Sequence, residues 1–464
     1  MPLANRIGFG MGGMVAATLG DFMYVYFLFF LTVGVGIDPV LSGTIMMVGI
    51  IWQAVLNLFI GIKSDKKRYD KDGNFVGKKR PFLLRTAIPT GAAFALLYTA
   101  VDFGPGMTIV YYLIAVFVYY VAYVSYELPY FAMAGSLTDD LDERTGIRRV
   151  ATSVEYFGTF LMGVLPPFLI DEFVFAYEPH PFAWTIIGVI LGGFSIILIF
   201  ICCVATKGKE LDLGDDEEKF NLKEALSLLK IKPYLVILLM VVMYFGYYTM
   251  TGQTFYIFMF WYGYEVIEIA AVYGIAAILG IIFVNINGKL AERHDKKKLL
   301  TGALIIGGAG SFIMSFVGLS TFGHIMIFNF TDALHGGAYW TIIWLLIYDT
   351  ADLDELKGGK RREGIMVGTY SFVTMISAGI FSQVNGILLG AAGYDGEAYY
   401  QSDETMQGIL EITTRWPGLL LIIAGLVIIM FPITRKKSAL IMKSLERKRE
   451  GKEFSVAGFE DLMR

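Results

Sequence analysis

The chain has 464 residues, of which 56% are hydrophobic, 15% aromatic and only 17% charged. A soluble protein of this length needs more polar surface than that composition supplies, so most soluble enzymes are excluded. The formal net charge of −4 gives no reason to expect a nucleic-acid partner. Cys202 and Cys203 are adjacent, which fits neither a disulfide nor a zinc site, so we expect no metal or other cofactor.

Runs of about 18 or more apolar residues recur along the chain, and each can cross a hydrocarbon core of about 30 Å. They lack the alternation of barrel strands, so we predict an all-α integral membrane protein. Twelve transmembrane helices are predicted at 7–33, 40–62, 82–101, 106–135, 150–170, 182–204, 233–260, 266–288, 299–318, 324–347, 365–390 and 416–434. They divide into two six-helix bundles, 1–204 and 233–434, with a linker at 205–232 and a tail at 435–464. We expect an amphipathic surface helix within the linker.

The basic residues predict the orientation of the chain in the membrane. Clusters of Lys and Arg fall on the even-numbered connections and the termini, and Arg415 is the exception on the opposite side. By the positive-inside rule, we predict a multi-pass protein of the cell membrane with both termini in the cytoplasm.

The two bundles share a short acidic motif. Asp140-Leu-Asp-Glu143 recurs as Asp352-Leu-Asp-Glu355, each after the fourth helix of its half and before a basic pair. This favours two pseudo-symmetric repeats, which is one plan of secondary transporters. We expect ion pairs between the halves to gate the cytoplasmic side, and the candidate gating residues are Asp140, Arg149, Asp352 and Arg361.

Three motifs together resemble one family. They are Trp344-x-x-x-Tyr-Asp349-Thr-Ala-Asp352 with the Glu363 that follows, Glu127-Leu-Pro129, and Gly77-Lys-Lys-Arg80-Pro81. This pattern is similar to the glycoside–pentoside–hexuronide:cation symporters of the major facilitator superfamily, typified by melibiose permease. The resemblance implies the major facilitator fold and transport of a small glycoside, pentoside or hexuronide by alternating access.

The cation site implied by the resemblance differs here. The family's second helix carries two acids four residues apart, and aligning Trp52 and Gly61 with that helix places Gln53 and Asn57 there. Amide oxygens can ligate Na⁺ but supply no charge, although the i,i+4 spacing keeps both on one helical face. The family's lysine on helix 11 falls on Met375. The coupling ion, H⁺ or Na⁺, is therefore left open.

Two carboxylates inside predicted spans are the main binding candidates. Asp21 lies near the middle of the first span, about one turn beyond the family's aspartate, and is assigned to both the substrate and the cation site. A central acid costs roughly 2.5–3.5 kcal/mol on insertion scales, which makes function its default interpretation. Glu127 matches a family acid that binds sugar hydroxyls, and its predicted burial also makes it a candidate proton carrier.

Five further residues complete the candidate sites. Tyr126 and Tyr130 share a face with Glu127 and are predicted to bind substrate, with packing as the alternative for each. Gln253 on the seventh span is another substrate candidate. Asp332 and His335 are three residues apart on the tenth span and hence on one face, a pattern that fits a proton relay.

We therefore expect a monomeric secondary active transporter whose partners are a small sugar and the membrane lipids. Proton symport through Glu127 or Asp21 is favoured, followed by Na⁺ symport and then uncoupled facilitation. Two alternatives stay open: a lysolipid or amphiphile carrier of the same fold, and a non-transporting membrane sensor or scaffold. An enzyme is not expected, because Gly8-x-Gly10-x-x-Gly13 opens a span, follows no strand and so fails as a dinucleotide motif.

Overall fold

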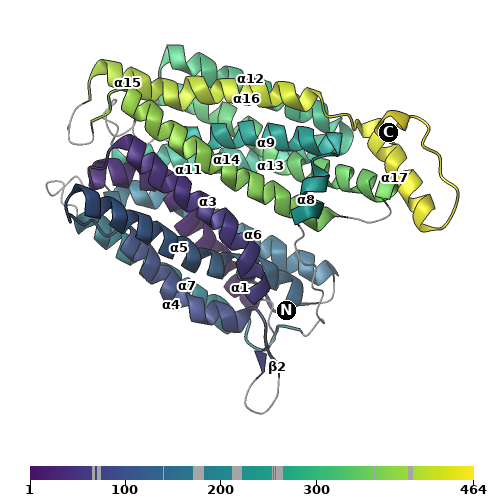
Figure 1. Cartoon of the computed structure of the whole chain (residues 1–464), viewed down its shortest axis with the longest axis horizontal. Helices are drawn as coiled ribbons and strands as arrows, with labels where there is room; N and C mark the ends of the chain where they lie inside the picture. The colour runs from purple at the N-terminus through teal and green to yellow at the C-terminus, as the bar shows by residue number, and fades with distance from the viewer. Residues whose placement is uncertain are drawn as a thin grey trace. The chain divides into compact units, whose positions relative to one another are not determined.

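A computed structural model describes residues 1–64, 68–69, 75–138, 141–170, 182–211, 222–252, 254, 257, 265–358, 362–395 and 401–463. Nearly all of these residues are helical (Figure 1). Within those ranges there is one sheet, a two-stranded antiparallel ribbon of β1 (Arg68–Tyr69) and β2 (Phe75–Gly77). Arg68 lies opposite Gly77, and Tyr69 lies opposite Phe75.

The helices of the first half follow the predicted spans. They are α1 (Leu3–Ala16), the π-helical η1 (Ala17–Asp21), α2 (Phe22–Phe29), the π-helical η2 (Phe30–Gly34), α3 (Pro39–Ser64), α4 (Arg80–Leu97), α5 (Pro105–Met133), the 3₁₀ turn η3 (Ala134–Ser136), α6 (Leu141–Ile170), α7 (Phe182–Ala205) and the linker helix α8 (Leu222–Leu228). The first four form one continuous helix with two π segments. Such segments occur frequently at functional sites, and η1 ends on Asp21.

The second half continues in the same way. Its helices are α9 (Lys232–Thr251), α11 (Val266–Arg293), α12 (Lys296–Val317), α13 (Phe322–Gly358), α14 (Glu363–Ala391), α15 (Asp403–Leu410), the π-helical η5 (Glu411–Arg415), α16 (Trp416–Ile429), and, in the tail, α17 (Arg435–Arg449) and α18 (Glu460–Met463). Among the described residues, 10 helices are long and apolar enough to cross a membrane. The spans predicted at 82–101 and 324–347 lie on α4 and α13, where arginines on α4, and Asp332 and two histidines on α13, lower the hydropathy. The count of twelve stays a prediction.

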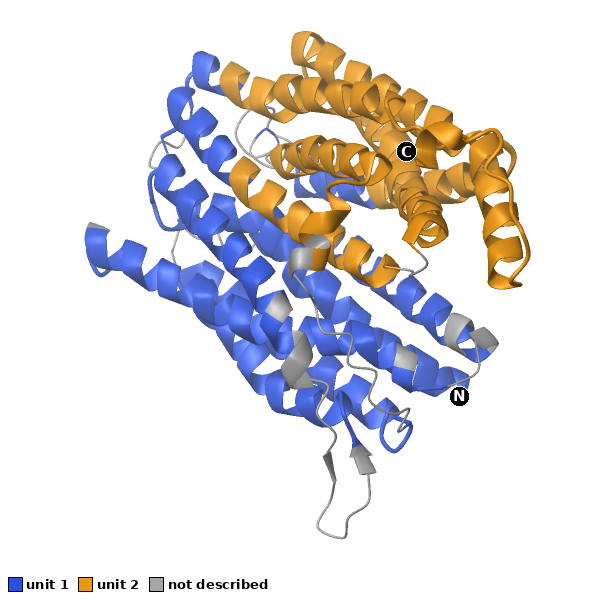
Figure 2. Cartoon of the chain, turned by 45° about the vertical axis from the view of Figure 1, so that its right-hand side comes forward, with its two compact units in different colours: residues 1–217, 255–274, 382–406 blue, residues 218–254, 275–381, 407–464 orange. Residues whose placement is uncertain are grey.

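The described chain forms two compact units (Figure 2). Unit 1 comprises Met1–Glu217, Phe255–Gly274 and Ser382–Met406. Unit 2 comprises Glu218–Thr254, Ile275–Phe381 and Gln407–Arg464. Each unit is a bundle of long helices, with α1, α3, α4, α5, α6 and α7 packing in unit 1 and α9, α12, α13 and α16 packing in unit 2.

Small residues let the helices of unit 1 approach closely. A Cβ added to Gly8 would lie 2.4 Å from Ala205 Cβ, and one added to Gly91 would lie 2.3 Å from the Gly192 carbonyl oxygen. Contacts this short exclude any side chain and are typical of helix packing in membranes. The glycine run of the first helix therefore serves packing, as its sequence context predicts.

The loop before α4 explains why its motif needs glycine. Gly77 has φ +126°, and a Cβ there would lie 2.3 Å from Glu210 Oε2. The buried Glu210 carboxylate accepts hydrogen bonds from the backbone N–H groups of Lys79 (2.7 Å) and Arg80 (3.1 Å). These groups begin α4, so the carboxylate occupies the positive end of the helix dipole. Burial lowers the pKa of Lys79, an effect that the nearby Glu210 charge opposes.

The tail packs on the ends of α12 and α13 in unit 2. Lys296 of α12 pairs with Asp349 of α13 at 2.8 Å, and the Ser438 hydroxyl of α17 donates to the same carboxylate at 2.9 Å. Arg449 donates two hydrogen bonds to Glu355, at 2.8 and 2.6 Å. We call these five residues the tail clamp. The end of the tail is also held, since Phe459 is fully buried against the unit 2 core.

Candidate functional site

Glu127 lies about four-fifths of the way along α5, one turn beyond Tyr123. The Tyr123 hydroxyl donates a hydrogen bond to Glu127 Oε1 at 3.0 Å, and the Gln53 side chain of α3 lies beside the same carboxylate. Gln53 is 4% exposed, and its Oε1 has no hydrogen-bond partner among the described residues. The site therefore joins a carboxylate to an amide with unused hydrogen-bonding capacity.

Asp21 approaches the same region from the end of η1. Its Oδ2 is buried and has no hydrogen-bond partner within the described ranges. Tyr24 and Tyr123 both lie within electrostatic range of Asp21 and Glu127. Neither carboxylate has an ion-pair partner in the part of the chain that the structure describes. Two mid-helix acids without a cation are costly in a membrane, which is why such residues usually serve a ligand or a proton.

The sequence places Glu155 at the start of the fifth predicted span, close to Arg148 and Arg149, and so predicts a salt bridge. In the structure Glu155 instead joins this group. It lies on α6 and faces α1, where a Cβ on Gly13 would be 3.2 Å from Glu155 Cβ. Among the described residues it forms no ion pair with either arginine. Its electrostatic neighbours are Arg148 and Asp21. Spacing along α6 suggested the arginines as partners, whereas the glycine face of α1 brings Glu155 toward the acids.

The two predicted substrate tyrosines are packed in the core of unit 1. Tyr126 and Tyr130 are both fully buried, and the Tyr126 hydroxyl donates to the Gly12 carbonyl. The Tyr130 ring stacks on Phe9 with centroids 5.0 Å apart. This geometry supports the packing alternative for both residues, because neither ring face is open to a sugar.

Several predicted site residues lie outside the described residues: Gln253, Asp140 and Arg361. Of the others, Asn57 is half-buried on α3, one turn beyond Gln53. Substrate binding by Gln253 and a cation role for Asn57 stay predictions.

In unit 2, Asp332 and His335 lie together on α13, as their spacing predicts. His335 Nε2 is 3.4 Å from Asp332 Oδ1, and the Tyr247 hydroxyl of α9 donates to the same oxygen at 2.5 Å. His335 is 1% exposed, whereas the Asp332 side chain is 45% exposed. Sequence reasoning missed Tyr247, although the run of tyrosines on the seventh span was available as an indication.

Residues next to the predicted gate are paired within unit 2. Arg362 holds Asp354 with two hydrogen bonds, at 2.8 and 2.6 Å, and also donates to the Ser227 hydroxyl of α8 at 2.7 Å. The hydrogen-bonded Asp354 carboxylate raises the pKa of Arg362. Asp352, a predicted gating residue, is half-buried on α13 two residues before Asp354, and its gating role stays a prediction. Arg149 is exposed on α6.

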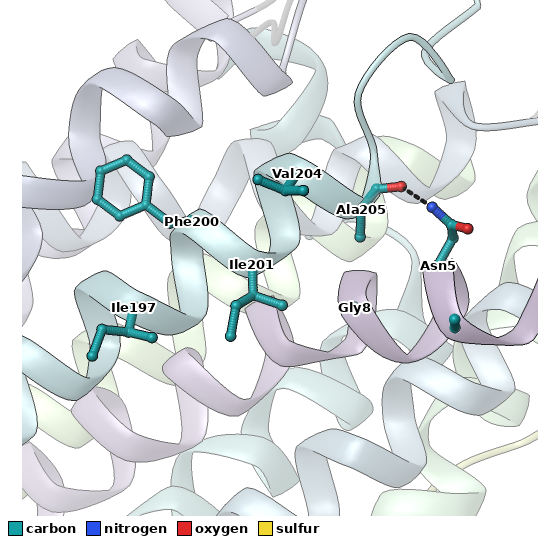
Figure 3. A pocket seen from close by; sticks show the side chains of 8 residues that line it. Asn5, Gly8, Ile197, Phe200, Ile201, Val204 and Ala205 are labelled. Atoms are coloured by element: carbon teal, nitrogen blue, oxygen red, sulfur yellow. Dashed lines mark hydrogen bonds between the residues drawn. The ribbon is translucent and has the colours of Figure 1, made fainter.

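An apolar groove lies between α1 and α7 (Figure 3), and none of the carboxylates described above lines it. Its volume is about 520 Å³, and its wall is built by Ile197, Phe200, Ile201 and Val204. The Asn5 side chain donates to the Ala205 carbonyl at 2.6 Å and so closes one end of the groove. Because the Asn5 amide group already donates to Ala205 and the other lining side chains are apolar, the groove has few hydrogen-bonding groups for a polyol.

The helical bundles and the buried acids define a class of protein, the polytopic helical transporters of the major facilitator type. Residues 8–435 match the family model described as MFS/sugar transport protein, and the chain belongs to that family. This confirms the predicted fold class and agrees with a transporter rather than an enzyme.

Relatives match along nearly their whole length. The chain is 25% identical to the "Putative sulfoquinovose importer" of Escherichia coli (strain K12), covering 98% of this chain and 96% of that one. It is 23% identical to the "Isoprimeverose transporter" of Lactiplantibacillus pentosus, covering 97% and 92%. It is also 24% identical to the "Uncharacterized symporter YnaJ" of Bacillus subtilis (strain 168), covering 96% and 95%.

Solved structures show the same fold. The crystal structure of D-xylose-proton symporter superimposes with a TM-score of 0.59 at 10% identity, covering 92% of this chain and 96% of that chain. The transporter FucP in the outward conformation gives a TM-score of 0.54 at 15% identity, covering 93% and 99%.

Proposed function

We propose that this protein is a monomeric secondary active transporter that carries a small glycoside, pentoside or hexuronide together with a proton. Family membership supports sugar transport, and relatives named as symporters or sugar transporters support the substrate class. In this proposal both termini are cytoplasmic and the membrane lipids are the only other partners.

The observation that carries the proposal is the uncompensated pair of acids in unit 1. Glu127 is held by the Tyr123 hydroxyl and flanked by Gln53, and Asp21 has an unused oxygen. Carboxylate oxygens accept several hydrogen bonds at once, which suits a polyol. Because no cationic side chain pairs with either acid among the described residues, a bound proton would remove the cost of a buried charge.

Protonation is favoured over sodium by the residues on α3. The amides Gln53 and Asn57 stand where the family has acids, so two negative charges that would attract Na⁺ are missing. Sodium binding in transport sites is helped by ligand charge, whereas a proton needs only one carboxylate. Glu127 is the residue best placed to carry it.

A binding panel tests the substrate class first. We would measure thermal-stability shifts of the purified protein with glycosides, pentosides and hexuronides, each in Na⁺ and in K⁺. Equal stabilisation by one sugar in both salts is the expected result. Stabilisation only in Na⁺ would contradict proton coupling, and no response to any sugar would favour the amphiphile carrier.

Transport by a Glu127→Gln variant then tests the coupling. In proteoliposomes, an inward proton gradient should drive sugar accumulation by the wild type but not by the variant, because the amide cannot carry a proton. Glu127→Asp is the matched control, since it keeps the carboxylate and should retain gradient-driven uptake. Unchanged accumulation by the Gln variant would reject Glu127 as the proton carrier.

A further inference from the structure

Asp332 lies near the middle of the span predicted on α13, and its side chain is partly exposed. It is ten residues beyond Phe322, where α13 begins, which corresponds to about 15 Å of helix, half of a hydrocarbon core of about 30 Å. Its side chain is 45% exposed. An ionisable side chain at this depth faces a water-filled cavity or a bundle interior, because exposure to lipid is too costly.

The same helical face continues into the interior of unit 2. His335 and Tyr339 follow Asp332 at i+3 and i+7, and they are 1% and 0% exposed. The Tyr339 ring stacks on Tyr244 of α9, with centroids 3.4 Å apart and planes 6° apart. Asp332 therefore lies on the face of α13 that packs into unit 2.

One hydroxyl donates to an oxygen of Asp332, an imidazole lies beside that same oxygen, and the described residues leave the other oxygen free. The Tyr247 hydroxyl donates to Oδ1, and His335 Nε2 is 3.4 Å from that same atom. Oδ2 has no hydrogen-bond partner among the described residues. A carboxylate oxygen can accept two hydrogen bonds, so the free oxygen can receive two hydroxyl groups.

The side chains of Tyr247 and His335 are themselves fixed by packing. The rings of Tyr247 and His335 meet edge-on with centroids 4.6 Å apart, and a Cβ on Gly307 of α12 would lie 2.3 Å from His335 Cδ2. Tyr244 of α9 also packs on the imidazole, at 6.0 Å. Asp332 is the only charged group that the described residues bring against this imidazole, so the ring is in place to orient that carboxylate.

We propose that Asp332 is a substrate subsite contributed by unit 2, which accepts hydrogen bonds from a pair of neutral sugar hydroxyls through Oδ2. Tyr247 and His335 are positioning residues: the Tyr247 hydroxyl holds the carboxylate by its other oxygen, and the His335 ring packs beside that oxygen. The proposal rests on the proposed sugar transport. It also narrows the chemistry, because a carboxylate or sulfonate group of a substrate would be repelled here, whereas a hydroxyl pair is bound.

Binding of the panel sugar and its monodeoxy analogues to wild type and Asp332→Asn tests the subsite. We expect the variant to bind the parent sugar about 10- to 100-fold more weakly, the loss of a hydrogen bond to a charged acceptor. An analogue that lacks a contacted hydroxyl should bind wild type and variant almost equally. Asp461→Asn, on the 61% exposed Asp461 side chain of the tail, is the matched control and should bind as the wild type does.

The positioning residues give a second measurement. Tyr247→Phe and His335→Gln should each weaken the parent sugar but not that same deoxy analogue, a selective loss that general destabilisation does not produce. Equal binding of every sugar by Asp332→Asn and wild type would overturn the subsite while leaving sugar transport intact. Unchanged affinity with a lost pH dependence would also overturn it, in favour of proton transfer. If the wild type binds no sugar, both proposals fail.

Discussion

The same kind of side chain, a buried carboxylate, has different consequences at different positions of this molecule. Glu210 accepts two hydrogen bonds from the first backbone N–H groups of α4, so its charge is balanced by the helix dipole. Asp21 and Glu127 have no such balance among the described residues. Structural and functional acids are therefore distinguished by their partners, which sequence composition does not reveal.

Gly77 offers a residue-level test of the Glu210 site. Gly77→Ala should lower the thermal unfolding temperature in detergent more than Gly36→Ala does. Both glycines have positive φ, at +126° and +79°, so both substitutions carry backbone strain of about 1 kcal/mol or more. Only at Gly77 would the new Cβ displace a carboxylate, since nothing lies within 4 Å of a Cβ at Gly36. Equal losses would show that Glu210 contributes little.

At the residue scale, sequence reasoning predicted some site members and missed others for a common reason. Asp332 and His335 were placed together because helical spacing alone brings them to one face. Tyr247 and Glu210 act through segments distant in sequence, so local spacing does not assign their partners, although the run of tyrosines on the seventh span pointed to Tyr247. The gate at Asp352 stays a prediction; the Arg362–Asp354 pair was not predicted, because a charged cluster does not show which members face one another.

At the scale of elements, the side chains of the tail clamp connect α12, α13 and α17 to one another. Asp349 is only 8% exposed and is shared by Lys296 and Ser438. Lys448 of α17 also donates to the carbonyl oxygens of Glu355 and Leu356, at 3.2 and 2.7 Å. Carbonyls at a helix end lack partners within the helix, and a lysine there also complements the dipole. The tail therefore completes the end of α13.

Two lysine substitutions separate a buried pair from an exposed pair. Lys296→Met should destabilise unit 2 by about 3–5 kcal/mol, because it leaves the Asp349 charge buried without its partner. Lys437→Met is the control: its partner Asp461 is 61% exposed, so unfolding should hardly change. Thermal unfolding in detergent measures both. Similar losses in the two variants would mean that the clamp is not buried in solution.

The elements themselves were largely predictable, and their ends less so. Apolar runs gave the helices, because a backbone in lipid must satisfy its own hydrogen bonds. The predicted span at 324–347 lies within α13, which extends from Phe322 to Gly358. The extra turns project beyond the apolar run and are held by the clamp, a tertiary effect. The π segments of the first helix were also not predictable from hydropathy.

At the scale of the whole molecule, the orientation in the membrane is a prediction from charge alone. Single cysteines placed at Asp102 or Ser320, which are both exposed, should react with an impermeant maleimide added outside intact cells. A cysteine at Lys452, whose side chain is 64% exposed in the tail, should react only after the membrane is opened. The native Cys202 and Cys203 are 0% and 1% exposed, so background should be low. Labelling of Lys452→Cys from outside would reverse the predicted orientation.

The loop around Glu210 and the tail around Phe459 stabilise their units from different places in the chain, which matters for the order of synthesis. Glu210 and its loop seal the start of α4 using residues up to 211, so that contact can form before most of the second half exists. Unit 2 behaves differently, because burial of Phe459 requires almost the last stretch of the chain. During translation the helices of the first bundle can therefore pack early, while the end of α13 stays uncapped until the tail has been made. Until then, the uncapped end of α13 would be accessible to quality-control proteases.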